Sequence, residues 1–236
     1  MEKTMKSIAE ITNHYGPQLA TMALDLGAIK LQVQQPFTWA SGYRMPIYND
    51  NRRLLASPKA RSLVCDAFCA MLDCLDFDVE NIAGTATAGI PHATTLADRL
   101  GKPLSYVRSS GKDHGLAQQI EGLGQSGSYE GAKVLLIEDL ISTGGSSIKA
   151  VEAIVKAGGV CPYTLAIFTY GFDAAVKAFE ALEPQAAFHT ILDYDVMVDS
   201  ALRTGYVDSD EARLLSQWRE DPFGWGEKHG FSQVVK

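Results

Sequence analysis

Two adjacent carboxylates, Glu138 and Asp139, stand between an apolar run and a loop of hydroxyl residues and glycines. The whole stretch, Val134 to Ser147, reads VLLIEDLISTGGSS. Glycines let backbone N–H groups approach an anion, hydroxyls donate further hydrogen bonds, and a helix N-terminus adds a favourable dipole. The loop therefore predicts a cup for a monophosphate. The carboxylates just before it are suited to the hydroxyls of a ribose attached to that phosphate.

A tight strand-to-helix turn with a hydroxyl cap is the other interpretation of this loop. The acidic pair argues against it, because two adjacent carboxylates at a strand end are costly unless they bind something. Other phosphate motifs do not fit. The chain has no GxxxxGK[ST] sequence, and the glycines of this loop are not spaced as GxGxxG.

Apolar patterns on both sides of the loop alternate between strands and helices. Strands are predicted at 81–84, 103–107, 133–137, 163–168 and 187–192. Helices are predicted at 58–75, 92–100, 147–157, 174–182 and 209–220, and an N-terminal helix is expected to be interrupted near Gly16-Pro17. This alternation predicts an α/β fold with a central, mostly parallel sheet flanked by helices. Ligands of such sheets gather at the carboxyl ends of the strands, where Glu138 and Asp139 are expected.

Bulk properties narrow the class of protein. The chain has 236 residues and a net charge of −7, which disfavours nucleic-acid binding. No apolar run is long enough for a membrane span and no signal core opens the chain, so we expect a cytoplasmic protein. Cys65, Cys69, Cys74 and Cys161 have no metal-ligand spacing and are expected to be small buried hydrophobes.

A glycine-rich polar stretch, 109–130, is too long for an ordinary connection within a compact domain. Arg108, Lys112 and His114 lie at its first end. The combination predicts a mobile, cationic lid. A solvated loop with ordinary surface charges is the alternative interpretation of the same residues. His92, which follows a proline at a helix start, is expected to be a cap or packing residue.

Val134 to Ser146 resembles the thirteen-residue signature of type I phosphoribosyltransferases, a hydrophobic strand, two acidic residues and a Thr/Ser/Gly phosphate loop. Within that group the chain is similar to orotate phosphoribosyltransferases over most of its length. Three further segments carry the similarity, in the family's order: FTWASGYRMPIYNDNR (Phe37 to Arg52), GTATAGIPHATTLADRLGKPLSYVR (Gly84 to Arg108) and KDHGLAQQIEG (Lys112 to Gly122).

The resemblance implies one phosphoribosyltransferase domain over residues 1–236. Its parts would be N-terminal helices and a small hood (about 1–57), a core sheet (about 58–195) with the lid at 109–130, and a helical extension (about 196–236). The implied reaction, part of UMP biosynthesis, moves 5-phosphoribosyl from 5-phosphoribosyl 1-diphosphate (PRPP) to orotate. The products are orotidine 5′-monophosphate and diphosphate. Mg²⁺ would be held mainly by substrate oxygens and not by protein ligands.

The resemblance also implies roles for individual residues. Lys112, His114 and Asp139 would be catalytic. PRPP would be bound by Arg108, Lys112, His114, Glu138, Asp139, Leu140, Ile141, Ser142, Thr143, Gly144, Gly145, Ser146, Thr85, Ala86 and Thr87. Orotate would be bound by Ser41, Gly42, Tyr48 and Ser142. The lid residues would reach over the neighbouring subunit's substrate in a homodimer with shared active sites, without nucleic-acid or membrane partners.

The chain departs from the family's pattern at several cationic positions. Ala40, Ala88 and Ser109 stand where some members have basic residues. An arginine that contacts the orotate carboxylate in some members is not evident in Ile167 to Phe172, and Arg44 or Arg52 could substitute for it. Two alternatives therefore stay open: a phosphoribosyltransferase for another nucleobase, and a non-catalytic nucleotide-sensing regulator of the same fold.

Overall fold

The computed structural model describes residues 5, 7–109 and 119–234. In that part of the chain the main sheet has six strands in the order β10-β9-β8-β5-β6-β7. All neighbours are parallel except β6 and β7. The strands are β5 (Asn81–Thr85), β6 (Leu104–Val107), β7 (Ile120–Glu121), β8 (Lys133–Ile141), β9 (Val160–Thr169) and β10 (Ala187–Asp193). The predicted α/β class is confirmed.

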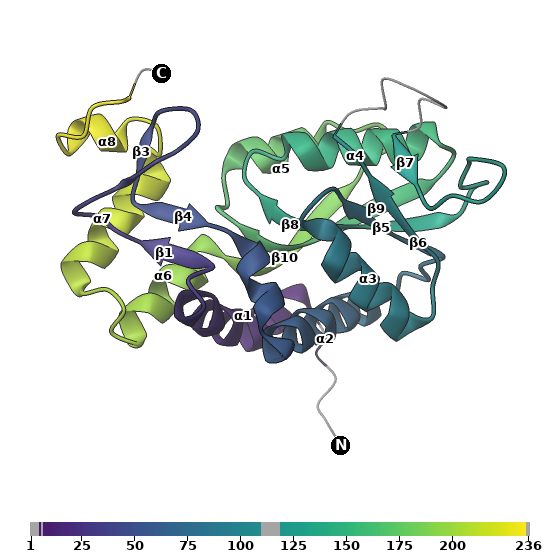
Figure 1. Cartoon of the computed structure of the whole chain (residues 1–236), viewed down its shortest axis with the longest axis horizontal. Coiled ribbons are helices and arrows are strands. Elements are labelled where there is room, and N and C mark those ends of the chain that lie inside the picture. The colour runs from purple at the N-terminus through teal and green to yellow at the C-terminus, as the bar shows by residue number, and fades with distance from the viewer. Residues whose placement is uncertain (1–4, 6, 110–118, 235–236) are drawn as a thin grey trace.

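Helices cover both faces of this sheet (Figure 1). On one face lie α1 (Ile8–Asp25), α2 (Pro58–Leu75) and α3 (Gly89–Leu100), and on the other lie α4 (Gly145–Lys156) and α5 (Asp173–Glu180). The central strands β5 and β8 are almost continuously buried, as expected for a parallel sheet with two covered faces. No helix among the described residues is long and apolar enough to cross a bilayer.

Strand β8 extends four residues beyond its predicted end at Ile137 and includes Glu138 and Asp139. The prediction ended the strand at its first charged residue. The backbone continues instead, because β9 pairs with β8 as far as Ile141. The carboxylates therefore sit on a rigid strand rather than in the loop after it. Likewise, α3 and α4 begin before their predicted starts, and β7 lies within the stretch predicted as a lid.

Helix α1 runs through Pro17 without a break, so the predicted interruption is wrong. Proline in a helix interior costs ~3 kcal/mol. Burying one Leu- or Ile-sized side chain contributes ~1.5–3 kcal/mol, and α1 buries Ile11, Leu19 and Leu24. Packing of the helix on its neighbours therefore outweighs the loss at the proline.

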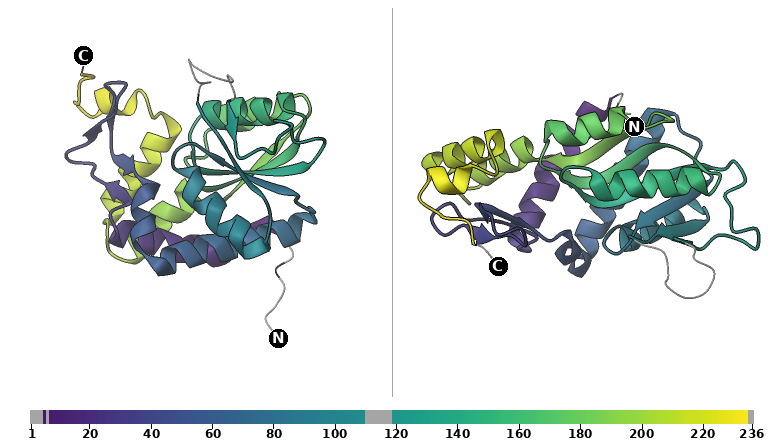
Figure 2. Two further views of the ribbon diagram at one scale, coloured as in Figure 1. Left: turned by 45° about the vertical axis from the view of Figure 1, so that its right-hand side comes forward. Right: turned by 90° about the horizontal axis from the view of Figure 1, so that it is seen from above.

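The N-terminal segment between α1 and α2 forms two small antiparallel ladders, which we call the hood (residues 29–49). It pairs β1 (Ile29–Leu31) with β4 (Ile47–Asn49), and β2 (Phe37–Thr38) with β3 (Arg44–Met45). A 3₁₀ helix, Asn51–Ala56, joins the hood to α2. The hood lies to one side of the main sheet (Figures 1 and 2).

Three C-terminal helices lie next to the hood (Figure 1). Helix α7 (Ser209–Glu220) matches its predicted bounds, and Asp208 and Glu211 close its N-terminus with a capping box. Of its predicted buried residues, Leu215 and Trp218 are buried and Leu214 is half-buried. Two further helices, α6 (Tyr194–Arg203), which follows β10 without a loop, and α8 (Trp225–Lys228), lie almost wholly within the predicted helical extension, although the apolar pattern gave no individual bounds for them.

Candidate active site

A cavity of about 440 Å³ opens at the carboxyl ends of β5, β6 and β8. The strand order places β5 between β6 and β8, so residues far apart in sequence meet at this edge. Its wall includes these predicted site residues: Thr85, Ala86, Thr87, Arg108, Glu138, Asp139, Leu140 and Ser146. The site residues predicted at these strand ends therefore lie together on the wall of one cavity.

Glu138 is buried at the centre of this site, and its carboxylate accepts hydrogen bonds from both sides. Thr85 Oγ1 donates to Oε1 at 2.6 Å, and the Asp139 N–H donates to the same oxygen at 3.0 Å. Ser146 Oγ and Ser147 Oγ donate to Oε2 at 3.4 and 3.2 Å. The carboxylate thus ties β5 to the start of α4. Both of its oxygens are engaged within the protein, so Glu138 holds the loop in shape.

Asp139 stands next to this buried carboxylate and lines the cavity. Burial and the negative charge of Glu138 raise the pKa of Asp139 to about 7, while the nearby Arg52 opposes the rise. Its main-chain oxygen accepts a hydrogen bond from Asn51 Nδ2 at 2.7 Å. Any hydroxyl donor or cation that enters the cavity would stabilise the charged form of this carboxylate.

The predicted phosphate loop connects β8 to α4. Gly144 has φ +85°, a left-handed conformation that suits glycine, and it is the residue before the first turn of α4. The first N–H groups of a helix have no acceptor within the helix. Thr169 Oγ1 donates to the Ile141 oxygen at 2.9 Å and fixes the start of the loop. The residues 141–145 do not form part of the cavity wall, whereas Ser146 does.

The loop 85–88 forms the opposite wall and leads into α3. A Cβ at Gly89 would lie 2.5 Å from both the Ile137 oxygen and Thr85 Oγ1, so only glycine fits there. His92, one turn into α3, is buried, and burial together with the charge of Arg61 lowers its pKa to about 4. It is therefore a neutral packing residue, as predicted.

Arg108 lies where β6 leaves the sheet. Its main chain pairs with Gln119, whose side chain also donates to the Arg108 oxygen at 3.1 Å, and its guanidinium lies 3.6 Å from Glu121 Oε1. These contacts close the base of the predicted lid. Lys112 and His114 lie outside the described residues.

The cavity wall also contains residues that the sequence interpretation did not assign. Lys149 lies three residues after Ser146 on α4, so both side chains fall on one helix face. Helical spacing from the phosphate loop could have identified it. Asn51, which anchors the Asp139 backbone from outside the cavity wall, lies in the segment Phe37 to Arg52 but was given no role. Ala88 and Ser109, where some family members are basic, line the cavity too.

The predicted orotate residues Ser41, Gly42 and Tyr48 lie on the hood and not on the cavity wall. The hood is linked to the site by two aromatic residues. The ring of Trp39 lies 5.7 Å from that of Tyr170, which follows the end of β9. The phenol of Tyr170 has a raised pKa because of burial and the charge of Asp139. The hood therefore lies against residues at the edge of the sheet that carries Asp139.

Arg44 and Arg52, suggested as substitute cations, have partners within the hood region. Arg44 Nη1 donates to Thr38 Oγ1 at 3.0 Å. Arg52 Nε lies 2.6 Å from Asp50 Oδ1, and its charge also acts on Asp139. Of the two arginines, Arg52 is the one whose positive charge lowers the pKa of Asp139.

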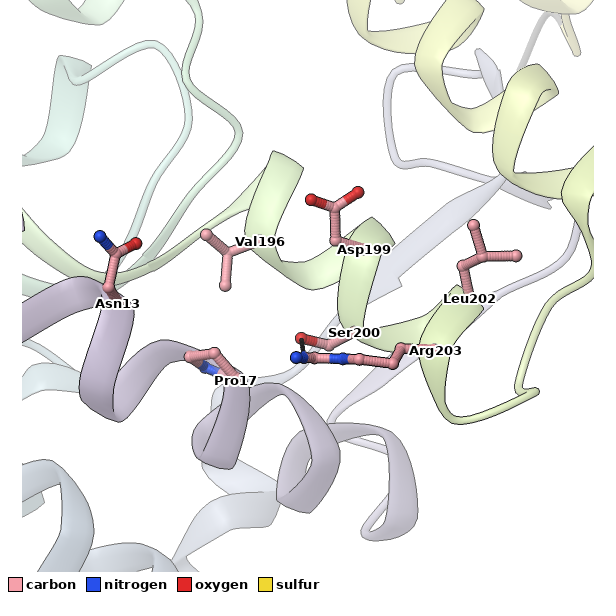
Figure 3. Close-up of a pocket in the computed structure, with 7 residues that line it drawn as sticks. All are labelled: Asn13, Pro17, Val196, Asp199, Ser200, Leu202 and Arg203. Carbon is pink, nitrogen blue, oxygen red and sulfur yellow. Dashed lines mark hydrogen bonds between the residues drawn. The ribbon is translucent and has the colours of Figure 1, made fainter.

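Another cavity, of about 420 Å³, lies between α1 and α6. Asn13 and Pro17 face it from α1, and α6 contributes Asp199 and Arg203 among others (Figure 3). Arg203 donates to Ser200 Oγ at 3.0 Å. This cavity contains none of the predicted site residues, so it gives no support to a phosphoribosyl site.

The cavity at β5 and β8, the acidic pair on its wall and the glycine- and hydroxyl-rich loop that follows β8 are the features expected of a phosphoribosyltransferase. A family model described as a phosphoribosyl transferase domain matches residues 76–171, which include β5, β8 and the loop.

Two curated relatives and one solved structure identify the particular family. The chain is 46% identical over 211 residues to an orotate phosphoribosyltransferase of Porphyromonas gingivalis, covering 89% of this chain and 98% of the relative. It is 45% identical over 208 residues to that of Bacillus caldolyticus, covering 88% and 98%. The Aeropyrum pernix orotate phosphoribosyltransferase structure matches with a TM-score of 0.65 at 27% identity, covering 80% and 99%. The chain belongs to the orotate phosphoribosyltransferase family, enzymes of pyrimidine biosynthesis.

Proposed function

We propose that this chain transfers the 5-phosphoribosyl group from PRPP to orotate and releases diphosphate. The observation that carries the proposal is the convergence of Thr85–Thr87, Asp139 and Ser146 on one cavity. Its wall would offer a carboxylate to the ribose hydroxyls, and hydroxyl and N–H donors to phosphate. The identity to orotate phosphoribosyltransferases supports orotate as the acceptor base.

The ribose 5-phosphate half of PRPP fits the end of β8. The phosphate would bind at Ser142–Ser146, where the N-terminus of α4 supplies N–H donors and a favourable dipole. Asp139 would accept hydrogen bonds from the ribose hydroxyls. Those bonds would also stabilise its charged form, which burial disfavours.

The diphosphate half fits the opposite wall. Residues Thr85–Thr87 and the cation Arg108 line that side of the cavity, and the cation Lys149 lines it from α4. Lys112 and His114 would add positive charge from the lid. Their task would be to neutralise charge that grows on the departing diphosphate as the ribose becomes cationic, a gain made in the transition state.

Mg²⁺ would enter the site together with the substrate. Among the described residues, no three His, Cys, Asp or Glu side chains are grouped to hold a metal ion. The oxygens of Glu138 accept protein hydrogen bonds, so Asp139 is the carboxylate left to meet a hydrated cation. Bound Mg²⁺ would screen the diphosphate charge, and substrate oxygens and water would supply most of its ligands.

The hood would determine the specificity for the base. Ser41, Gly42 and Tyr48 would lie near orotate, and the contact between Trp39 and Tyr170 links the hood to the edge of the sheet. Charge for the orotate carboxylate would come from Arg52, whose field reaches Asp139.

A homodimer with shared active sites follows if Lys112 acts on the neighbouring subunit's substrate. Mixing inactive Lys112→Ala and Asp139→Asn proteins would then restore about a quarter of the activity, because half of the molecules would be hybrids with one intact site of two. The measurement is orotate turnover after subunit exchange. Activity that stays at the level of the separate variants would exclude sharing of these residues between subunits.

The proposed function itself is tested by the choice of base. Diphosphate release from PRPP with Mg²⁺ should require orotate, and adenine, hypoxanthine and guanine should give only background rates. Turnover with a purine and none with orotate would show instead that the chain is a transferase for another nucleobase.

A further inference from the structure

The last described residues of the chain lie across the turn of the hood. We call residues Phe231–Val234 the C-terminal strap. The strap lies beside the hairpin of β2 and β3 in the views of Figures 1 and 2, although the two segments are nearly two hundred residues apart in sequence. The strap therefore joins the end of the chain to the hood.

Two hydrogen bonds hold the strap on this turn. The Val234 N–H donates to the Gly42 oxygen at 2.9 Å, and Gln233 Nε2 donates to the Ser41 oxygen at 3.1 Å. The approach is close, because a Cβ at Gly42 would lie 2.2 Å from the Val234 oxygen. Gly42 also has φ +85°, so both its conformation and its contact with the strap require glycine.

The strap is anchored on α8, which itself packs on the hood. The Phe231 N–H donates to the Gly226 oxygen at 2.8 Å, and the rings of Trp225 and Phe231 stack with centroids 6.0 Å apart. A Cβ at Gly226 would lie 3.1 Å from Arg44 in β3. The strap is thus held at its start while its end is bonded to the turn.

The turn needs such support. Strands β2 and β3 have only two residues each, and an isolated hairpin of this length is marginal in water. Within it, the Trp39 N–H donates to the Tyr43 oxygen at 3.0 Å and the Gly42 N–H to the Trp39 oxygen at 2.8 Å. The strap therefore acts on the turn that holds Trp39 against Tyr170.

We propose that the C-terminal strap is a positioning element that fixes the Trp39–Tyr43 turn and thereby sets the affinity for the base. This inference rests on the proposed function, in which Ser41 and Gly42 lie near orotate. The strap itself touches no reacting group. It would leave the ribose-phosphate cavity unchanged, since Gln233 and Val234 contact the hood and do not line that cavity.

The test compares two shortened chains, one ending at Ser232 and one ending at Val234. The chain ending at Val234 keeps both hydrogen bonds and is the matched control. Loss of these two bonds to backbone oxygens should raise the KM for orotate about five- to tenfold. The KM for PRPP should stay within about twofold in both chains. A melting curve for each chain sets the assay temperature well below unfolding.

A second pair of variants removes one bond at full length. Val234→Pro lacks the N–H that donates to Gly42, whereas Val234→Ala keeps it. The proline variant should show an orotate KM raised about threefold over the alanine variant, with an unchanged PRPP KM.

The possible outcomes distinguish a failure of the strap inference from a failure of the proposed function. If the full-length chain does not turn over orotate, the proposed function fails. If it does, but the chain ending at Ser232 has an unchanged orotate KM, the strap inference is wrong and the function stands. Equal rises in both KM values would also overturn the inference, because they would indicate a merely structural role.

Discussion

The ribose-phosphate site and the hood are built in different ways. The first is assembled from strand ends and the loops that directly follow them, held together by one buried carboxylate, Glu138. The hood is assembled from short ladders near the N-terminus that depend on aromatic residues and strap contacts from the C-terminal third. The first region thus has its own rigid sheet, whereas the second relies on distant parts of the chain.

This difference separates two tasks of the enzyme. In the proposed function, the group common to every phosphoribosyl transfer would meet the rigid region. The base would meet the hood, whose short ladders are held in place by contacts with distant parts of the chain. A change in the first region should impair the reaction with any base. A change in the hood should act on orotate alone.

Asp139→Asn is expected to have the largest effect. The amide keeps the shape of the carboxyl group but loses the charge that meets the developing cation on the ribose, so kcat should fall about 10²- to 10³-fold. Asp199→Asn, in the cavity between α1 and α6, is the control and should retain full activity. Steady-state assays of both proteins make the comparison, and similar losses in the two would break the assignment of the site.

The pH dependence of stability should show a second effect of the same residue. The pKa of Asp139 is about 7 in the folded protein, above its ordinary value near 3.9. Between about pH 4 and 7 the unfolded chain loses this proton while the folded chain keeps it, so the contribution to the free energy of unfolding falls as pH rises.

Asp139→Asn removes this penalty. A shift of about three pKa units corresponds to roughly 1.4 kcal/mol per unit, so the variant should gain stability relative to wild type on the order of 4 kcal/mol between pH 4 and pH 8. Urea unfolding at the two pH values measures the gain. An equal difference between the proteins at both pH values would mean that Asp139 titrates normally.

Trp39→Phe should have the smallest effect and should act on the hood alone. The variant loses the N–H that donates to the Ile47 oxygen at 3.0 Å while keeping an aromatic ring against Tyr170. One such bond is worth about 1 kcal/mol, which is about a fivefold rise in the KM for orotate. The KM for PRPP should not change. A rise in the PRPP value instead would show that hood and cavity are coupled.

The sequence predicted the first region well because its signals are local. An apolar strand, two carboxylates and a Gly/Ser/Thr loop are contiguous, and helix α2 and helix α7 follow from periodicity and caps. The prediction ended β8 too early because pairing with β9, a long-range contact, carries the strand past its charged residues. It broke α1 at Pro17 because the packing that offsets a proline cannot be seen locally.

The hood was less predictable because its contacts are long-range. The contacts of Asn51 with the Asp139 backbone, of Trp39 with Tyr170 and of the strap with Gly42 join distant segments. None has a short-range pattern. In the first region, Lys149 was overlooked although its spacing from Ser146 on α4 could have revealed it.

A crystal structure of the enzyme with orotidine 5′-monophosphate tests the division into two regions most directly. We expect the 5′-phosphate on the Ser142–Ser146 loop, the ribose hydroxyls at Asp139 and the base facing the hood near Ser41 and Gly42. A nucleotide bound between α1 and α6, or a base turned away from the hood, would contradict this account.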